Sequence, residues 1–117
     1  LQRLSDIAGI TTFSWGKPNV VSNYAYFPIL FDENILGINR DEVAEGLEKD
    51  YNVLVRKYFY PLLSDLHCYQ QENDSNDTPN AKRISSQVLT LPLYVDLEAT
   101  QVDYICDAVL EILGSVC

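Results

Sequence analysis

Cationic and aromatic side chains that could bind a ligand are concentrated in one short segment of the chain. The segment consists of Val55, Arg56, Lys57, Tyr58, Phe59, Tyr60, Pro61 and Leu62. If it forms a strand, alternation places Arg56, Tyr58 and Tyr60 on one face, with Lys57 and Phe59 on the other. A guanidinium beside two phenols suits an anionic or polyhydroxylated ligand. The alternative is a strand whose aromatic residues fill the core and whose cations offset the acidic charge of the protein.

Other residues that commonly do chemistry are sparse. His67 is the only histidine and belongs to no nucleophile signature, so it is either a ligand contact or a partly buried or surface side chain. The five glycines never cluster into a phosphate-binding loop, and no metal-binding motif is present. The four lysines are Lys17, Lys49, Lys57 and Lys82, and none is an obvious Schiff-base former.

Length, charge and cysteine usage exclude several classes of protein. The 117 residues suffice for one domain, and a net charge of −9 argues against nucleic-acid binding. No apolar run approaches the roughly 18 residues of a membrane span, so no membrane partner is expected. The three cysteines form no Cys-X-X-Cys pair, which favours a reducing, cytoplasmic setting without disulfides.

Three segments predict strands that could position the cationic and aromatic residues. These are residues 24–31, 52–60 and 89–95, preceded by a short apolar run at 10–15. Pro28 cannot donate to a ladder, so the first of these strands is expected at a sheet edge or with a bulge.

Helical patterns lie between and after these strands. Residues 1–8 resemble the end of a helix, and Asn39 with Glu42 predicts a capping box for a helix whose buried side is Val43, Leu47 and Tyr51. A short helical turn is expected at 64–71. The last helix carries an apolar stripe that includes a buried Cys106, with Asp96 as its expected cap. The stripe consists of Val102, Ile105, Cys106, Val109, Leu110 and Leu113.

The polar segment 72–80 predicts a mobile surface loop. It ends with Thr78 as a helix cap and Pro79 at the first helical position. Ala81, Ile84 and Val88 then give the following helix of about ten residues an apolar side. Together these patterns predict one α+β domain over residues 1–117, a small antiparallel sheet of about three or four strands packed against helices.

Four segments in this order resemble the C-terminal region of the DegT/DnrJ/EryC1/StrS aminotransferases. They read Asn-Tyr-Ala-Tyr-Phe-Pro-Ile-Leu-Phe (23–31), Arg-Lys-Tyr-Phe-Tyr-Pro-Leu (56–62), Ser-Gln-Val-Leu-Thr-Leu-Pro-Leu-Tyr (86–94) and Val-Asp-Tyr-Ile-Cys (102–106). The resemblance runs over residues 23–113. Many members carry a histidine where this chain has Phe59, so His67 remains only a possible ligand contact.

The resemblance implies the small C-terminal domain of a fold-type-I enzyme that depends on pyridoxal phosphate. The absence of methionine and the helix-like start also predict a fragment of a longer enzyme. The implied substrates are nucleotide-linked keto-deoxy sugars, in particular dTDP-linked ones, with an amino acid such as glutamate as amino donor. The implied partners are an N-terminal large domain and, for the parent enzyme, a second copy in a homodimer.

For this chain the resemblance implies substrate contacts and no coenzyme site. The candidate contacts are Arg56, Tyr58, Phe59, Tyr60, Pro61 and His67. Since the Schiff-base lysine is expected upstream, the isolated chain is expected to be inactive and to bind no pyridoxal phosphate. The alternative is a non-enzymatic acidic α+β module that binds a small ligand or another protein.

Overall fold

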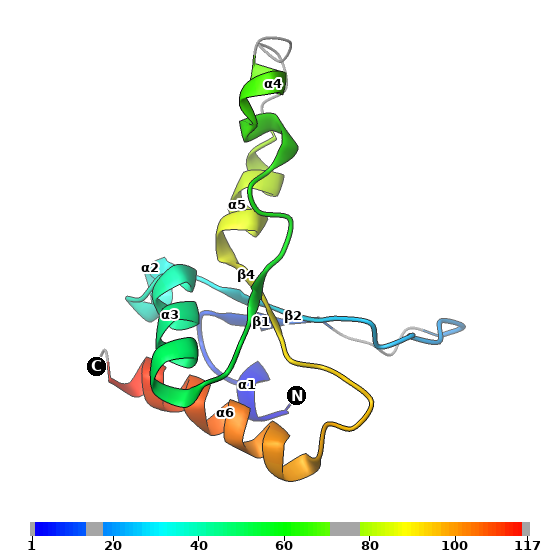
Figure 1. Ribbon diagram of the computed structural model, residues 1–117, viewed down its shortest axis with the longest axis vertical. Helices are drawn as coiled ribbons and strands as arrows, with labels where there is room; N and C mark the ends of the chain where they lie inside the picture. Colours follow the sequence, from blue (N-terminus) through cyan, green and yellow to red (C-terminus); the bar gives the residue numbers. More distant parts are fainter. Residues whose placement is uncertain (1, 14–17, 71–77, 116–117) are drawn as a thin grey trace.

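Four short strands form one antiparallel sheet. The computed structural model describes residues 2–13, 18–70 and 78–115. The strands β1 (Ile10–Thr12), β2 (Phe27–Phe31), β4 (Val88–Leu91) and β3 (Arg56–Lys57) lie in this order across the sheet (Figure 1). The predicted small antiparallel α+β sheet is confirmed.

All three predicted strands are shorter in the structure, and the one predicted at 89–95 ends at Leu91. The segment predicted at 24–31 pairs only from Phe27, and the one predicted at 52–60 pairs only at Arg56 and Lys57. β4 ends at Leu91, the partner of Phe27, so β2 has no neighbour before Phe27, whereas β3 ends at Lys57 because residues 58 and 59 form a turn. Aromatic and branched residues favoured extended backbone here, but the ladder extends only as far as its neighbour does.

The expectation that the strand with Pro28 lies at a sheet edge is wrong. β2 lies inside the sheet, between β1 and β4. Pro28 is nevertheless tolerated because the ladder with β1 stops at the pair Thr12–Ile29, one residue short of it. On that side Pro28 has no strand neighbour that needs its missing N–H.

Helices α3 (Arg40–Tyr51) and α6 (Ala99–Gly114) cover one face of the sheet and enclose the core. The predicted capping box of α3 is present: Asn39 Oδ1 accepts from the N–H of Glu42, whose carboxylate accepts from the N–H of Asn39. Val43 and Leu47 are fully buried, and Cys106 of α6 is buried as predicted. The expected cap Asp96 is wrong, because Glu98 precedes α6 and donates its N–H to the Gln101 side chain.

An arm of helices stands away from this body. It comprises the 3-10 helix η1 (Leu63–Asp65), α4 (His67–Gln70) and α5 (Pro79–Gln87), at the top of Figure 1 and far from α6. The predicted turn at 64–71 and the start of α5 at Pro79 are confirmed, but the Thr78 side chain makes no capping bond. Most of the loop predicted at 72–80 lies outside the described residues.

The arm makes the molecule more extended than its length requires. Its radius of gyration is 15.9 Å, against about 13 Å for a compact domain of this size. Two short helices, α1 (Gln2–Ser5) and α2 (Glu33–Leu36), complete the fold. None of the helices described is long and apolar enough to cross a membrane.

Candidate functional site

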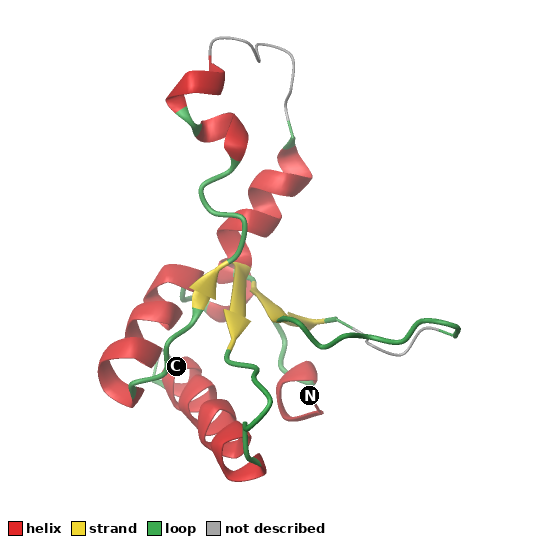
Figure 2. Cartoon of the chain, turned by 45° about the vertical axis from the view of Figure 1, so that its right-hand side comes forward, coloured by secondary structure: helices red, strands yellow, loops and turns green. Residues whose placement is uncertain are grey.

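The face of the sheet opposite α3 and α6 is the candidate site. Register sets which residues point there, because Arg56 pairs with Thr90, and Thr90 pairs with Pro28. Leu89 and Leu91 point to the other face, into the core. Figure 2 shows the arm rising beyond one end of the sheet, and α5 contacts β2.

An apolar groove runs between α5 and the turn that follows β3. Its volume is about 840 Å³. One wall is α5 with Ala81 and Ile84, and the other wall is the turn with Phe59 and Pro61. Ile84 is 40% exposed and Phe59 is 70% exposed. The apolar side predicted for this helix therefore exists, but within the described chain nothing covers it.

A smaller polar cleft of about 280 Å³ lies next to the groove. It is lined by Arg56, Thr90 and two half-exposed phenols, Tyr26 and Tyr94. Thr90 Oγ1 donates to the carbonyl of Arg56 at 3.2 Å, and this hydrogen bond holds the start of β3 against β4. The Tyr26 ring lies 5.1 Å from that of Tyr58, which lines the groove, so the groove and the cleft adjoin.

The predicted common face of Arg56, Tyr58 and Tyr60 is wrong. Strand alternation ends at Lys57, because the next two residues form a turn in which Phe59 has a positive φ of 52°. The Phe59 ring accordingly lies 4.1 Å from that of Tyr58, not on the opposite face. Tyr60 instead lies beside Lys57, whose Nζ is 5.3 Å from the centre of its ring.

The fold places the predicted substrate-contact residues in different parts of the site. Tyr58, Phe59 and Pro61 line the groove, and Arg56 lines the cleft. His67 is exposed at the start of α4 and lines neither of them.

Sequence reasoning missed three residues of this region. Tyr26 and Tyr94 lie just outside the paired residues of β2 and β4, and only the tertiary structure brings both beside Arg56. Arg40 was not considered, although its guanidinium carbon lies 4.8 Å from the centre of the Tyr60 ring. A cation at the first position of a helix was a usable signal, because the helix dipole disfavours it there.

The two cations near the Tyr60 ring, Arg40 and Lys57, are both paired with Asp41. Lys57 Nζ lies 2.9 Å from Asp41 Oδ1. This hydrogen bond, and then the charge of Arg40, hold the pKa of Asp41 below its ordinary value against the opposing effect of burial. Lys49 is likewise paired, with Glu45. Among the residues that the structure covers, no cluster of His, Cys, Asp or Glu could hold a metal ion.

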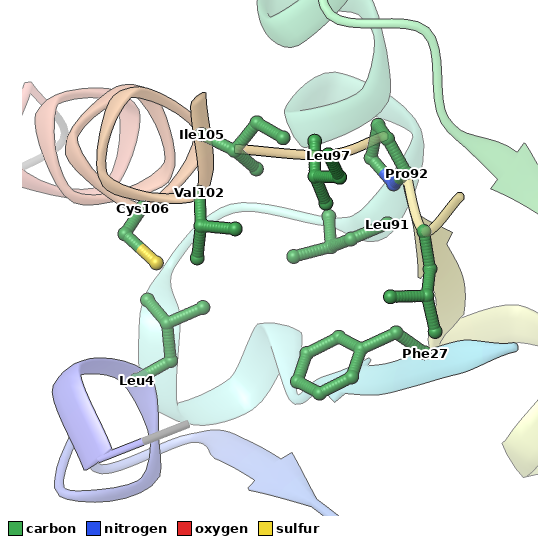
Figure 3. Close-up of a pocket in the computed structure, with 9 residues that line it drawn as sticks. Leu4, Phe27, Leu91, Pro92, Leu97, Val102, Ile105 and Cys106 are labelled. Atoms are coloured by element: carbon green, nitrogen blue, oxygen red, sulfur yellow. The ribbon is translucent and has the colours of Figure 1, made fainter. Parts of the chain in front are cut away.

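A third cavity adjoins the cleft, with which it shares Leu91, Pro92 and Leu93, and its lining side chains are apolar apart from one thiol. It has a volume of about 150 Å³ and lies between α1, the end of β4 and α6 (Figure 3). Leu4, Phe27 and Ile105 line it together with Cys106. Burial raises the pKa of the Cys106 thiol, so the thiol stays protonated at neutral pH. This cavity offers an anionic ligand no charged partner.

The fold and the site define a class: a small α+β domain with an open sheet face that offers an apolar groove and a cation beside two phenols. Residues 1–110 match the DegT/DnrJ/EryC1/StrS aminotransferase family. The chain belongs to this family.

Relatives and solved structures agree with this assignment. The dTDP-4-amino-4,6-dideoxy-D-glucose transaminase of Shigella dysenteriae is 36% identical over 95% of this chain and 29% of its own length. The enzyme of the same name from Escherichia coli is 43% identical over 80% of this chain and 25% of its own length. DesI, solved with its TDP-sugar product, superposes with a TM-score of 0.77 and 27% identity over 98% of this chain and 28% of its own.

These comparisons also bear on size and coenzyme. The chain spans only 25–29% of the two curated relatives it matches. Solved structures of the same fold include an aminotransferase determined in both PLP and PMP forms.

Proposed function

We propose that the chain is the C-terminal domain of a pyridoxal-phosphate-dependent transaminase that acts on a nucleotide-linked keto sugar. Family membership supports the reaction class, and the names of the two relatives support a dTDP-linked 4-keto-6-deoxy sugar as substrate. An amino acid such as glutamate would be the amino donor. The single observation that carries the proposal is the Arg56 cleft, which joins a cation and two phenols to an apolar groove.

Arg56 is the residue we assign to the anionic part of the substrate. It lines the cleft, and no ion pair to its guanidinium is present among the described residues. Tyr26 and Tyr94 can exchange hydrogen bonds with sugar or phosphate oxygens, and Tyr58 offers a flat apolar surface. Phe59 and Pro61 extend this surface. Tyr60 and His67 line neither the cleft nor the groove. We propose that they contact the substrate only where other parts of the enzyme bring it to them.

Exposed apolar side chains in the loop before β2 and in the arm are proposed to dock against the upstream large domain of the same enzyme. The chain accounts for less than a third of the length of its relatives, so most of the enzyme lies outside it. Val21 is 97% exposed and Leu63 is 71% exposed, one in the loop before β2 and one in the arm. Apolar side chains presented in this way favour burial against another protein surface. A homodimer of the parent would bury further surface of this kind.

The coenzyme would be bound by the large domain, since the described residues do not fit it. Lys49 and Lys57 are held in ion pairs, Lys82 is exposed on the arm, and Lys17 lies outside the described residues. When bound, pyridoxal phosphate carries the amino group from the donor to the sugar ketone. The isolated chain is therefore expected to neither bind it nor catalyse. Recovery of a borohydride-reduced coenzyme–lysine adduct on one peptide of the chain would contradict this.

The test of the proposed function uses the full-length enzyme and the 4-keto counterpart of dTDP-4-amino-4,6-dideoxy-D-glucose. Arg56→Gln should raise KM for the sugar nucleotide by about 10- to 100-fold, the effect of losing one charge-assisted contact. The half-reaction with the amino donor alone should be unchanged. Arg83→Gln on the exposed side of α5 is the matched control. An unchanged KM in Arg56→Gln would remove this residue from the substrate site.

The family assignment favours this enzyme over a non-enzymatic acidic binding module. A full-length protein without transaminase activity toward any nucleotide-linked keto sugar would restore the module as the better proposal. The free thiols of Cys68 and Cys106 fit the reducing, cytoplasmic location that we infer.

A further inference from the structure

Arg40 is a buried cation in a position that its own helix does not favour. It is the first residue of α3, where the helix dipole opposes positive charge, yet its side chain is only 3% exposed. Asn39 and Glu42 already cap this helix. Besides its ion pair with Asp41, the Arg40 side chain contacts two segments far away in the sequence.

The first segment is the C-terminal end of α5. Arg40 Nη1 donates to the carbonyl oxygens of Ser85 at 2.9 Å and Val88 at 3.1 Å. Carbonyls at the end of a helix lack intrahelical partners and attract cations. The last turn of α5 contains no basic residue, so Arg40 supplies from α3 the charge that α5 itself lacks.

The second segment is the turn after β3. The Arg40 guanidinium carbon lies 4.8 Å from the centre of the Tyr60 ring, and Lys57 Nζ lies 5.3 Å from it. Both cations are attracted to the face of the ring. Asp41 Oδ1 lies 2.6 Å from Arg40 Nε and 2.9 Å from Lys57 Nζ, which holds the two cations together despite their like charge.

These two segments are the opposite walls of the apolar groove. α5 contributes Ala81 and Ile84, and the turn contributes Phe59 and Pro61 on either side of Tyr60. We propose that Arg40, which does not line the groove, is a positioning residue that holds both walls and thereby sets the spacing between them. Its consequence for catalysis rests on the proposed function, because the groove adjoins the Arg56 cleft.

The direct test is hydrogen exchange of the full-length protein carrying Arg40→Met. Amides in residues 58–66 and in 82–91 should both exchange at least about tenfold faster, the scale of one lost charge-assisted interaction. Amides of α6 at 105–113 should stay within about twofold of the parent protein. Arg83→Met is the matched control, because it removes the same charge from an exposed position on α5 and should leave both walls unchanged.

Two further variants keep the test decisive if Arg40→Met does not fold. Arg40→Lys keeps the charge, but one ammonium cannot reach both carbonyls and the ring. Amides of both walls should therefore exchange faster than in the parent protein, by a smaller factor than in Arg40→Met. Tyr60→Leu removes the ring and leaves the carbonyl bonds, so 58–66 alone should loosen. Tyr60→Phe should preserve the parent pattern. The proposal would be overturned if exchange became faster in only one wall of either Arg40 variant. It would also be overturned if exchange rose equally everywhere, including α6.

Kinetics separate this proposal from the proposed function. In an active transaminase, Arg40→Lys should raise KM for the sugar nucleotide by about three- to tenfold with kcat and the donor half-reaction nearly unchanged. An unchanged KM together with loosened walls would limit the role of Arg40 to the fold. If the full-length protein has no transaminase activity, the exchange pattern still decides whether Arg40 joins the walls, so the two failures are distinguishable.

Discussion

The ring of Tyr26 lies 5.1 Å from the ring of Tyr58, which joins the loop before β2 to the turn after β3. The two residues are far apart in the sequence and do not belong to paired strand positions. Their contact is the boundary between the apolar groove and the Arg56 cleft. The geometry of the candidate site therefore depends on a side-chain contact as well as on the ladder of the sheet.

A double-mutant cycle of Tyr26→Ala and Tyr58→Ala should reveal this contact. We expect a coupling free energy of about 0.5–1.5 kcal/mol, the range found for aromatic pairs. The measurement is urea unfolding of the 117-residue chain. The control pair is Tyr58→Ala with Tyr104→Ala, since Tyr104 contacts Tyr51 elsewhere and should show no coupling. Equal coupling in both pairs would mean that the effect is not specific to the contact.

Gly46 sets how closely α3 and α6 approach each other. A Cβ added there would lie 3.1 Å from Ile112 Cδ1, and Ile112 is buried. Gly46→Ala gains about 1 kcal/mol of helix propensity but incurs an overpacking cost of about 1–3 kcal/mol, so we expect a net loss of about 1 kcal/mol. Thermal unfolding checks this. Ile112→Val removes the Cδ1 atom that the new Cβ would meet. The double variant should therefore lose less stability than the two single variants lose together, and strictly additive losses would disprove the clash.

The lowered pKa of Asp41 should make the free energy of unfolding depend on pH in the acidic range. Because its pKa is lowered in the folded protein, its contribution is present above the unfolded value of about 3.9 and is lost as pH falls through the lower folded value. Its side chain is 52% exposed, so the contribution is at most about 1 kcal/mol. Asp41→Asn should flatten the profile of unfolding free energy below about pH 4. Lys57→Met should do the same, and the two changes should not add.

The thiols should differ sharply in reactivity. Cys68 is exposed, whereas Cys106 is 6% exposed and burial raises its pKa. In a Cys117→Ser background, we expect labelling of Cys106 by a disulfide reagent to be at least about 100-fold slower than labelling of Cys68. Denaturant should abolish the difference. Comparable rates in the folded chain would place Cys106 at the surface.

Periodicity and capping chemistry in the sequence alone determined the helical part of the fold. The capping box of Asn39 and Glu42 is a local signal and is found as predicted, and so is the buried stripe that contains Cys106 except for Val102, which is 39% exposed. The four motifs that resemble the aminotransferases led to the family that the comparisons support. These inferences needed no knowledge of which segments meet in space.

Only the tertiary structure decided how the aromatic segment is divided. Alternation predicted Tyr60 beside Arg56, but the chain turns after Lys57, and in that direction β4 extends no further than Val88. The turn that follows places Tyr60 against Arg40, while the segments that flank β2 and β4 bring Tyr26 and Tyr94 beside Arg56. Pairing between distant segments sets both outcomes, and no local pattern contains it. The sequence thus determined the residue types available for binding, and long-range packing decided which of them share a site.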